Sequence, residues 1–307
     1  MKRKSNNDKH PFSKFQKKKP HIEDYYEEAE QPERKERPAK KPFEKKRFVK
    51  GKKFNAKKKP SKPQETYEAP VEENMRLNKY IAHAGICSRR KASEHIKNGL
   101  VTVNDQVVLE MGYKVQKDDV VKFQGAIIQP TRNHVYLLLN KPKNVITTLQ
   151  DENGRRTVLD FVSDVTSERI YPVGRLDRNT TGLLILTNDG VLAQKLSHPS
   201  FGVKKVYKAT LDKSLLPEHL EQIRNTLQLE DGPAPVDAVE YGASKKVIGI
   251  EIHIGRNRIV RRIFEHLGYE VVKLDRVRYA SLTKKNLPVG KCRFLTPQEL
   301  VILKHLS

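Results

Sequence analysis

The sequence predicts an α+β protein with two folded domains behind a charged amino-terminal segment. Two short helical patterns and a hairpin pattern fall within residues 75–122. Beyond residue 135, apolar runs of strand length are interspersed with amphipathic helical patterns. Because strands and helices of this kind must bury their apolar faces together, we expect a second domain of sheet and flanking helices at residues 135–307.

Residues 1–72 differ in composition from the rest of the chain. They hold 23 Lys and Arg against 12 Asp and Glu, and scarcely any Leu, Ile or Val. Such a segment buries too little apolar surface to offset the entropy lost on ordering, so we predict a disordered basic tail. A solubility tail and a non-specific RNA-binding tail are equally compatible with this charge run.

The net charge of the 307-residue chain is +23. The tail supplies +11 of it, the difference between 23 and 12, so the folded part still carries +12. An excess of this size in both parts indicates a phosphate-rich partner such as RNA.

The two cysteines, Cys87 and Cys292, are too few for a disulfide framework or a zinc site. The chain begins MKRKSNNDKH without an apolar signal region, and it contains no run of 18 apolar residues. We therefore expect a cytoplasmic protein that is neither secreted nor inserted in a membrane.

A pair of helices opens the first predicted domain. Apolar residues at helical spacing predict the first helix, which Gly85 ends: Leu77, Tyr80, Ile81 and Ala84. Ser88 can cap a second helix whose first turn is Arg89, Arg90 and Lys91. Three cations there oppose the helix dipole, which favours an anion at this end; a solvated basic face is the alternative. A small hairpin follows at residues 100–108.

One carboxylate lies in unusual surroundings. The apolar run Leu183–Leu186, followed by the turn residues 188–190, predicts a strand. Asp177 lies in the loop that enters this strand, between Arg175 and Arg178. Nearby positive charge favours the ionised carboxylate, which can act as a nucleophile or a base. An ordinary surface ion pair is the alternative.

Two stretches resemble known families. Gly-Arg-Leu-Asp followed by Thr-Thr-Gly-Leu-Leu-Ile-Leu-Thr-Asn-Asp-Gly resembles the catalytic motif of the RsuA-like pseudouridine synthases, which modify ribosomal RNA. This resemblance implies that Asp177 is catalytic. The run RLNKYIAHAGICSRRKASEHIKNGLVTVNDQVV resembles an S4 RNA-binding domain at residues 75–122. Its RNA-binding surface would be Arg89, Arg90 and Lys91.

Two shorter elements extend the synthase resemblance. YLLLNKPKNVITT is similar to the family's first strand and loop, with Asn144 where the family often has Gly; Asn also tolerates a left-handed backbone. Lys205-Val206-Tyr207 resembles the second motif, whose tyrosine stacks on the target base. A phenol suits stacking and proton transfer, although a strand Tyr without this context is usually a packing residue.

The third motif lies in GRNRIVRR, at the start of a helix predicted for residues 259–267. It resembles Gly-Arg-x-x-Gln-Val-Arg-Arg, in which the later Arg pairs with the catalytic Asp; here that Arg is Arg261, and Ile259 replaces Gln. A bidentate pair would keep Asp177 ionised, and an RNA backbone contact is the alternative for Arg261. Further cations are predicted to bind RNA: Arg175, Arg178, Lys205, Arg256, Arg258 and Arg262.

The resemblance implies a complete reaction. A specific uridine in ribosomal RNA, 23S in preference to 16S, would be flipped from its stack and isomerised to pseudouridine. No metal and no cofactor are implied. We expect a monomer that acts on structured RNA with an unpaired target or on assembling ribosomal particles. The fold implied is α+β: a small helix pair with a hairpin, followed by a mixed, mainly antiparallel sheet with flanking helices.

Other functions are less compatible with these residues. An RNA chaperone or ribosome-assembly factor would use the S4-like domain and tail alone, and would not need Asp177, Tyr207 and Arg261. An RNA methyltransferase would need a glycine-rich donor-binding loop, which is absent from the sequence. A glycosidase would need two opposed carboxylates.

Three stretches have weaker or purely structural patterns. Residues 125–134 contain Gly, Pro and polar residues, and we interpret them as the joint between the domains. Residues 231–240, DGPAPVDAVE, are interpreted as an exposed connection. Thr296 and Glu299 have the spacing of a capping box, which predicts a final helix.

Overall fold

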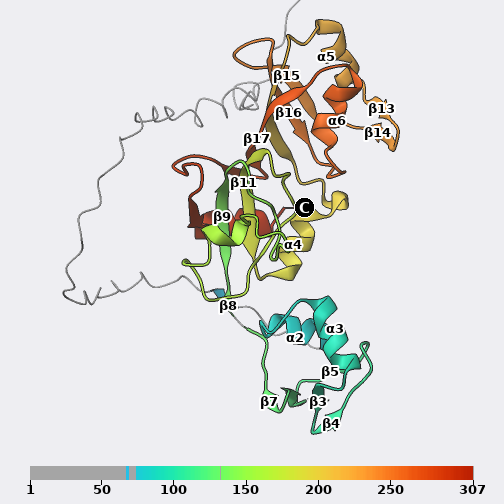
Figure 1. Ribbon diagram of the computed structural model, residues 1–307, viewed down its shortest axis with the longest axis vertical. Coiled ribbons are helices and arrows are strands. Elements are labelled where there is room, and N and C mark those ends of the chain that lie inside the picture. Colours follow the sequence, from blue (N-terminus) through green and yellow to red (C-terminus); the bar gives the residue numbers. More distant parts are fainter. Residues whose placement is uncertain (1–66, 69–73, 132, 307) are drawn as a thin grey trace, which may run out of the picture.

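The computed structural model describes residues 67–68, 74–131 and 133–306, which form a small and a large folded unit (Figure 1). The predicted tail, residues 1–72, lies outside the described residues except for Tyr67–Glu68. These two form β1, which pairs antiparallel with β8 (Asn133–His134), so they are not part of a disordered segment. None of the helices in the described part of the chain is long and apolar enough to cross a membrane.

The helix pair of the small unit agrees with the prediction. It comprises α2 (Leu77–His83) and α3 (Arg89–Lys97). The Ser88 hydroxyl accepts a hydrogen bond of 3.2 Å from the Lys91 backbone N–H, so the predicted helix cap is confirmed. Gly85 follows α2 with φ of 80°, a left-handed conformation that favours glycine.

The sheet of the small unit is larger than the predicted hairpin. Four strands pair antiparallel in the order β4-β3-β6-β7, and β2 pairs separately with β5. The strands are β2 (Met75–Arg76), β3 (Val101–Val103), β4 (Gln106–Val107), β5 (Lys114–Val115), β6 (Val121–Phe123) and β7 (Ala126–Ile127). Because β7 pairs with β6 and Ile128 is buried in the same core, the unit continues beyond the limit predicted at residue 122. The start of the expected joint therefore belongs to this sheet.

The large unit is built on one nine-stranded sheet with the main order β15-β16-β12-β17-β11-β9-β19. Strands β11 and β17 are parallel, and every other named pair in the sheet is antiparallel. The prediction of a mixed, mainly antiparallel sheet is confirmed. The strands are β9 (Tyr136–Lys141), β10 (Tyr171–Pro172), β11 (Thr180–Thr187), β12 (Lys205–Leu211), β15 (Ala238–Tyr241), β16 (Val247–Ile252), β17 (Val271–Tyr279), β18 (Leu282–Thr283) and β19 (Cys292–Phe294).

The helices divide this unit into two packed regions (Figure 1). Helices α5 and α6 pack with β12, β15 and β16 around one apolar core, and α4 and α7 pack with β9 and β11 around a second. The predicted capping box of α7 is confirmed at Thr296 and Glu299. The helical elements are η2 (Val158–Phe161), α4 (Gly190–Ser197), η3 (Pro199–Phe201), α5 (Pro217–Arg224), α6 (Ile259–His266) and α7 (Pro297–Lys304).

Two parts of the large unit differ from the sequence prediction. Residues 231–240 are not an exposed connection: they contain β14 (Gly232–Ala234), which pairs with β13 (Leu227–Leu229), and most of β15. Ala234 is fully buried, because the hairpin packs onto the α5 and α6 core. Strand β17 was not predicted. Its charged residues obscure the alternating apolar pattern, although the strand lies between β12 and β11.

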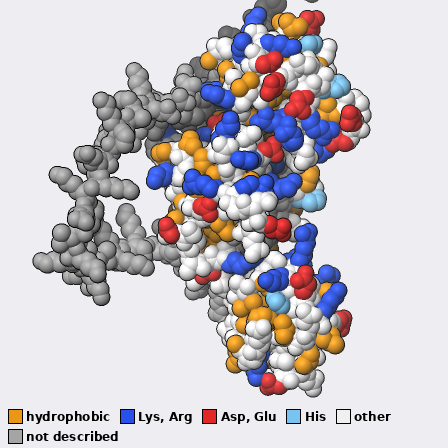
Figure 2. Space-filling model, in the orientation of Figure 1, with side chains coloured by type: hydrophobic (Ala, Val, Ile, Leu, Met, Phe, Trp, Pro, Cys, Tyr) orange, Lys and Arg blue, Asp and Glu red, His pale blue; other side chains and the backbone are white. Residues whose placement is uncertain are grey.

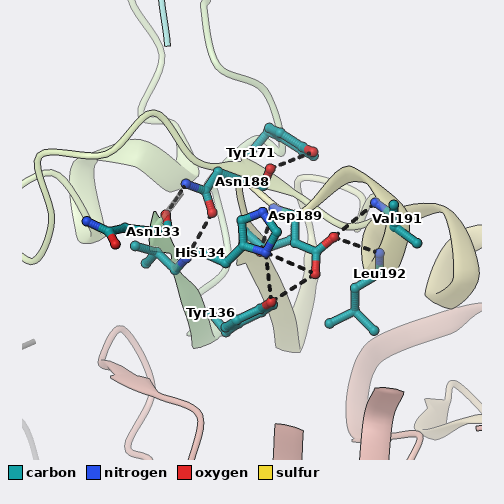
Figure 3. A network of polar contacts seen from close by, with 10 residues as sticks. Asn133, His134, Tyr136, Tyr171, Asn188, Asp189, Val191 and Leu192 are labelled. Carbon is teal, nitrogen blue, oxygen red and sulfur yellow. Dashed lines mark hydrogen bonds and ion pairs between the residues drawn. The ribbon is translucent and has the colours of Figure 1, made fainter. Parts of the chain in front are cut away.

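The turn that ends β11 is fastened by a polar network (Figure 3). The Asp189 carboxylate accepts from the backbone N–H groups of Val191 and Leu192, each at 3.0 Å, and from the Tyr136 hydroxyl at 2.8 Å. The Asn188 side chain accepts from the Val135 N–H at 2.8 Å. Asp189 therefore caps α4 at the opposite end of β11 from Asp177, which gives this acidic residue a structural role.

Replacing Asp189 with alanine is expected to reduce the free energy of unfolding by about 2–4 kcal/mol. The change removes a helix cap and the 2.8 Å hydrogen bond that the buried Tyr136 hydroxyl donates to Asp189. Urea unfolding of the variant, compared with Asp164→Ala at an exposed position, measures the loss. Equal stability of the two variants would contradict the assigned role.

Candidate active site

The loop that carries Asp177 is held firmly at its base. Thr147 donates a hydrogen bond of 2.8 Å to the Leu176 carbonyl and accepts one of 3.2 Å from the Leu176 N–H. The Thr180 N–H closes the next turn onto the Asp177 carbonyl at 3.0 Å. Leu176 is buried, whereas the Asp177 side chain is 40% exposed to solvent. The carboxylate is thus both fixed and accessible, as a reacting group must be.

Arg261 lies beside Asp177, in the first turn of α6. Its Nε is 3.9 Å from Asp177 Oδ2, and its Nη1 donates to the Val271 carbonyl at 2.6 Å. The prediction that Arg261 forms a bidentate pair with Asp177 is therefore wrong, because Nη1 of the guanidinium is bonded to the β17 backbone. The buried Arg261 guanidinium still places its positive charge beside the Asp177 carboxylate.

Tyr207 faces the same region from β12. It is directly opposite Arg276 in the antiparallel β12–β17 pair, next to an irregularity in the register. Its hydroxyl accepts from Arg276 Nη1 at 3.4 Å. Because a guanidinium has no acceptor, the proton of the Tyr207 hydroxyl is free to point elsewhere.

Asp177 and Tyr207 line one open cleft of the large unit. Six residues from the sequence prediction line it: Asp177, Tyr207, Lys205, Arg175, Arg256 and Arg258. The sequence did not indicate two further lining residues, Thr180 and Arg276. Many Lys and Arg side chains lie on the visible face of the large unit in Figure 2. The cleft combines one carboxylate and one phenol with several cations.

Three arginines predicted to bind RNA make contacts within the protein. Arg262 holds the Asp231 carboxylate with two hydrogen bonds of 2.8 and 2.6 Å. Arg256 pairs with Asp231 at 3.1 Å and donates to backbone carbonyls of the β13–β14 hairpin. Arg262, followed by Arg256, lowers the pKa of Asp231 to about 2. Arg258 pairs with Glu265 at 3.0 Å. The contacts of Arg256 and Arg262 fasten the β13–β14 hairpin beside α6, whereas the Arg258 pair lies within the region of α6 itself.

The other predicted RNA-binding residues are exposed and more dispersed. Arg175 lies at the cleft, and Arg178 is exposed but does not line it. Arg89, Arg90 and Lys91 are exposed at the start of α3, in the small unit. The structure therefore presents one cationic group around the cleft and another on the small unit.

Lys141 is a buried residue that the sequence prediction overlooked. Its ammonium donates to the carbonyls of Pro142 at 3.0 Å and Val145 at 2.8 Å, and lies 3.5 Å from the Arg178 carbonyl. Burial lowers its pKa to about 8, opposed by the negative charge of Asp177. Lys141 thereby ties the loop after β9 to the Asp177 loop. The expected left-handed backbone at Asn144 is confirmed, with φ of 65°.

Lys205 is buried at the cleft, where its ammonium donates to the His253 carbonyl at 3.0 Å. Burial, followed by repulsion from Arg276, lowers its pKa from 10.5 to about 8. Between about pH 8 and pH 10.5 the Lys205 amine is protonated to a greater extent in the unfolded chain than in the folded chain. Lys205 therefore makes the free energy of unfolding increase as the pH rises through this range.

Lys205→Met should lack this contribution. The difference in free energy of unfolding, wild type minus Lys205→Met, is expected to increase by about 1–2 kcal/mol between about pH 7.5 and about pH 9.5. Urea unfolding at both pH values measures it. Lys141 is common to both proteins and cancels in the comparison. A difference that stays constant or shrinks would contradict the lowered pKa.

No cluster of three or more His, Cys, Asp or Glu residues with the arrangement of a metal site occurs in the described ranges. The polar side chains that line the cleft include Asp177, Tyr207 and several cations.

Comparison with known proteins places the chain in a family. The model of the RNA pseudouridylate synthase family matches residues 135–266, and the model of the S4 domain matches residues 75–121. Ribosomal large subunit pseudouridine synthase B of Bacillus subtilis is 46% identical over 237 residues, which cover 76% of this chain and 96% of that protein. The chain belongs to the RsuA-like pseudouridine synthases.

Two further comparisons agree with this membership. The dual-specificity RNA pseudouridine synthase RluF of Escherichia coli K12 is 37% identical to this chain over 235 residues, which cover 76% of this chain and 79% of that protein. A crystal structure of a pseudouridylate synthase, 27% identical, has a TM-score of 0.56 and covers 75% of this chain and 99% of that one. The small unit is the S4 domain, and the large unit carries the RNA pseudouridine synthase fold.

Proposed function

We propose that this synthase converts a specific uridine of ribosomal RNA, in the 23S molecule, to pseudouridine, with Asp177 as the residue that starts the reaction. The observation that carries this proposal is the convergence of Asp177 and Tyr207 at one cleft, with Arg261 beside the Asp177 carboxylate. These residues are 84 positions apart in the chain at most. The similarity to large-subunit synthase B supports 23S RNA as the substrate.

The reaction breaks the bond from C1′ of the ribose to N1 of uracil and rejoins the ring through C5. An ionised Asp177 can start it by attacking C1′ or by removing the 2′ proton. Tyr207, with its ring at the cleft, is suited to stack on the uracil and to carry a proton through its hydroxyl. Arg261 places its positive charge 3.9 Å from the Asp177 carboxylate and helps to orient it.

A uridine in a base stack cannot reach a carboxylate inside this cleft. We infer that the target nucleotide is flipped out of the RNA, which requires least energy at an unpaired position. Exposed cations near the cleft and on the S4 domain would hold the flanking backbone: Arg175, Arg178, Arg89, Arg90 and Lys91. Binding should therefore weaken steeply as the salt concentration rises.

Carbodiimide mapping of pseudouridine tests the proposed function. Unmodified 23S and 16S transcripts are incubated with the full-length protein, and reverse-transcription stops are compared with those of untreated RNA. We expect a stop at one site or a few sites in 23S RNA. The same experiment on assembling large-subunit particles covers a substrate that forms only during assembly. No stop on either substrate would refute the proposed function and favour a non-enzymatic assembly factor.

A further inference from the structure

Unpartnered polar atoms collect around Asp177. In the described part of the chain, six buried side-chain nitrogen or oxygen atoms have no hydrogen-bond partner. Three of them are next to the carboxylate or in its cleft: Thr180 Oγ1, Arg261 Nε and Arg276 Nη2. A buried polar group without a partner costs free energy, so such a cluster indicates a site that a ligand completes.

Arg276 is the most constrained of the three. The residue is only 3% exposed, and its Nε donates to the Leu183 carbonyl at 2.7 Å while Nη1 donates to the Tyr207 hydroxyl at 3.4 Å. The guanidinium carbon lies 4.7 Å from the centre of the Tyr279 ring. Nη2 is therefore held rigidly at the cleft with no partner of its own.

A second buried cation accompanies it. The Lys205 ammonium lies 5.8 Å from the centre of the same Tyr279 ring and also lines the cleft. Within the described ranges, no ion pair joins either Arg276 or Lys205 to a carboxylate. Two buried positive charges without a counter-ion are unfavourable, so the cleft is prepared to receive negative charge.

The proposed reaction generates such a charge on the base. When the bond from C1′ to N1 breaks, its electron pair stays with the uracil, where it spreads from N1 onto the carbonyl oxygens. An RNA phosphate is the other available anion. Arg276 contacts Tyr207, the tyrosine that would stack on the base, and Lys205 lines the same cleft, whereas Arg175 at the cleft is exposed and better placed for the backbone.

We propose that Arg276, assisted by Lys205, donates to a uracil oxygen and stabilises the uracil anion that forms when the bond to the ribose breaks. This inference rests on the proposed function and adds a catalytic residue to it. Fixed donors directed at developing charge need no reorganisation during the reaction, and the loss of one typically costs about 10²–10³-fold in rate.

The electrons and protons balance in either version of the reaction. If Asp177 attacks, its bond to C1′ forms as the N1 bond breaks, and C5 later displaces it. If Asp177 removes the 2′ proton, the electron pair of the C2′–H bond forms a double bond between C1′ and C2′ as the bond to N1 breaks. Asp177 returns the proton to C2′ when C5 of uracil adds to C1′. In both, the proton on C5 is lost and N1 gains one, so the product is an isomer of the substrate.

The test compares Arg276→Met with Arg278→Met, a variant of the same strand that does not line the cleft. The substrate is the 23S transcript that the wild type modifies, under single-turnover conditions with saturating enzyme. We expect Arg276→Met to react about 10²–10³-fold more slowly with unchanged RNA affinity, and Arg278→Met to react at the wild-type rate. Weakened binding with an unchanged rate would overturn the proposal in favour of phosphate binding.

The leaving group gives a readout that a purely structural role would not change. Fluorine at C5 makes the uracil anion more stable by itself, so breakage of the C1′–N1 bond of a 5-fluorouridine in the same RNA should depend less on Arg276. Fluorine cannot leave C5 as a cation, so this substrate stops at the adduct rejoined through C5, and the measured quantity is the consumption of 5-fluorouridine. We expect the rate deficit of Arg276→Met to shrink by about tenfold or more, since one donor supplies only a few kcal/mol. An identical deficit on both substrates would overturn the proposal.

Arg276 is buried, so a second variant guards against misfolding. Arg276→Lys retains the positive charge, and its thermal unfolding midpoint is measured beside that of the wild type. A folded Arg276→Lys enzyme should show a smaller rate deficit than Arg276→Met, with the same dependence on fluorine. If both Arg276→Lys and Lys205→Met react at the wild-type rate, the proposal is refuted. If the wild type itself makes no pseudouridine, the proposed function fails first, which keeps the two failures distinct.

Discussion

Asp177→Asn is expected to abolish pseudouridine formation, with a rate reduction of about 10⁴-fold or more, while RNA affinity and folding remain unchanged. An amide is nearly the same shape as a carboxylate but cannot attack C1′ or remove the 2′ proton. The side chain makes no hydrogen bond that holds the fold: its polar contact is the 3.9 Å approach of Arg261. Single-turnover conversion of the mapped transcript measures the loss.

Asp164→Asn is the matched control, because it removes one negative charge at an exposed position outside the cleft. It should react at the wild-type rate. Substantial residual activity in Asp177→Asn would show that another group starts the reaction. Loss of activity together with loss of RNA binding would instead assign Asp177 to substrate binding.

Gly182→Ala is expected to unfold or severely destabilise the protein, by about 4 kcal/mol or more. Gly182 is opposite Arg276 in the parallel pair of β11 and β17. A Cβ at this position would lie 2.5 Å from the Arg276 backbone nitrogen and closer still to its carbonyl oxygen, both rigid parts of the sheet. The φ of 113° is in addition unfavourable for any side chain. The motif glycine thus allows β11, which follows the Asp177 loop, to approach β17, which carries Arg276.

Thermal unfolding of Gly182→Ala, with Gly112→Ala as the control, tests this explanation. A Cβ at Gly112 would meet only the Glu110 carboxylate, the end of a flexible side chain. We expect the control to unfold within a few degrees of the wild type, and the Gly182 variant to be insoluble or to lose most of its cooperative transition. A stable Gly182 variant would show that β17 can move away from β11 at little cost.

Local sequence features predicted much of the architecture. The caps at Ser88 and Thr296, the turn at Gly85 and the left-handed Asn144 were all expected and are present. Each depends on side chains and backbone groups within about four residues of one another, so a short stretch of sequence contains all the interactions that decide it. The motifs identified the family, and the comparisons confirm it.

Contacts between distant segments were predicted less well. Arg256, Arg258 and Arg262 of the third motif were assigned together to RNA. Arg262 instead holds Asp231, a residue 31 positions away, and Arg256 fastens the same hairpin. A charged side chain looks the same in the sequence whether it faces solvent, a carboxylate or a ligand. Its role depends on which partner the folded chain brings within a few ångströms.

By itself, the sequence determined many of the helices and strands, the mixed sheet implied by the family and the identity of the candidate carboxylate, because periodicity, caps and motifs are properties of neighbouring residues. Only the tertiary structure decided that β17 lies between β12 and β11, and therefore that Arg276 and Lys205 are buried at the cleft of Asp177. The physical reason is that β17 is stabilised by its two neighbouring strands. Its own charged sequence does not predict a buried strand.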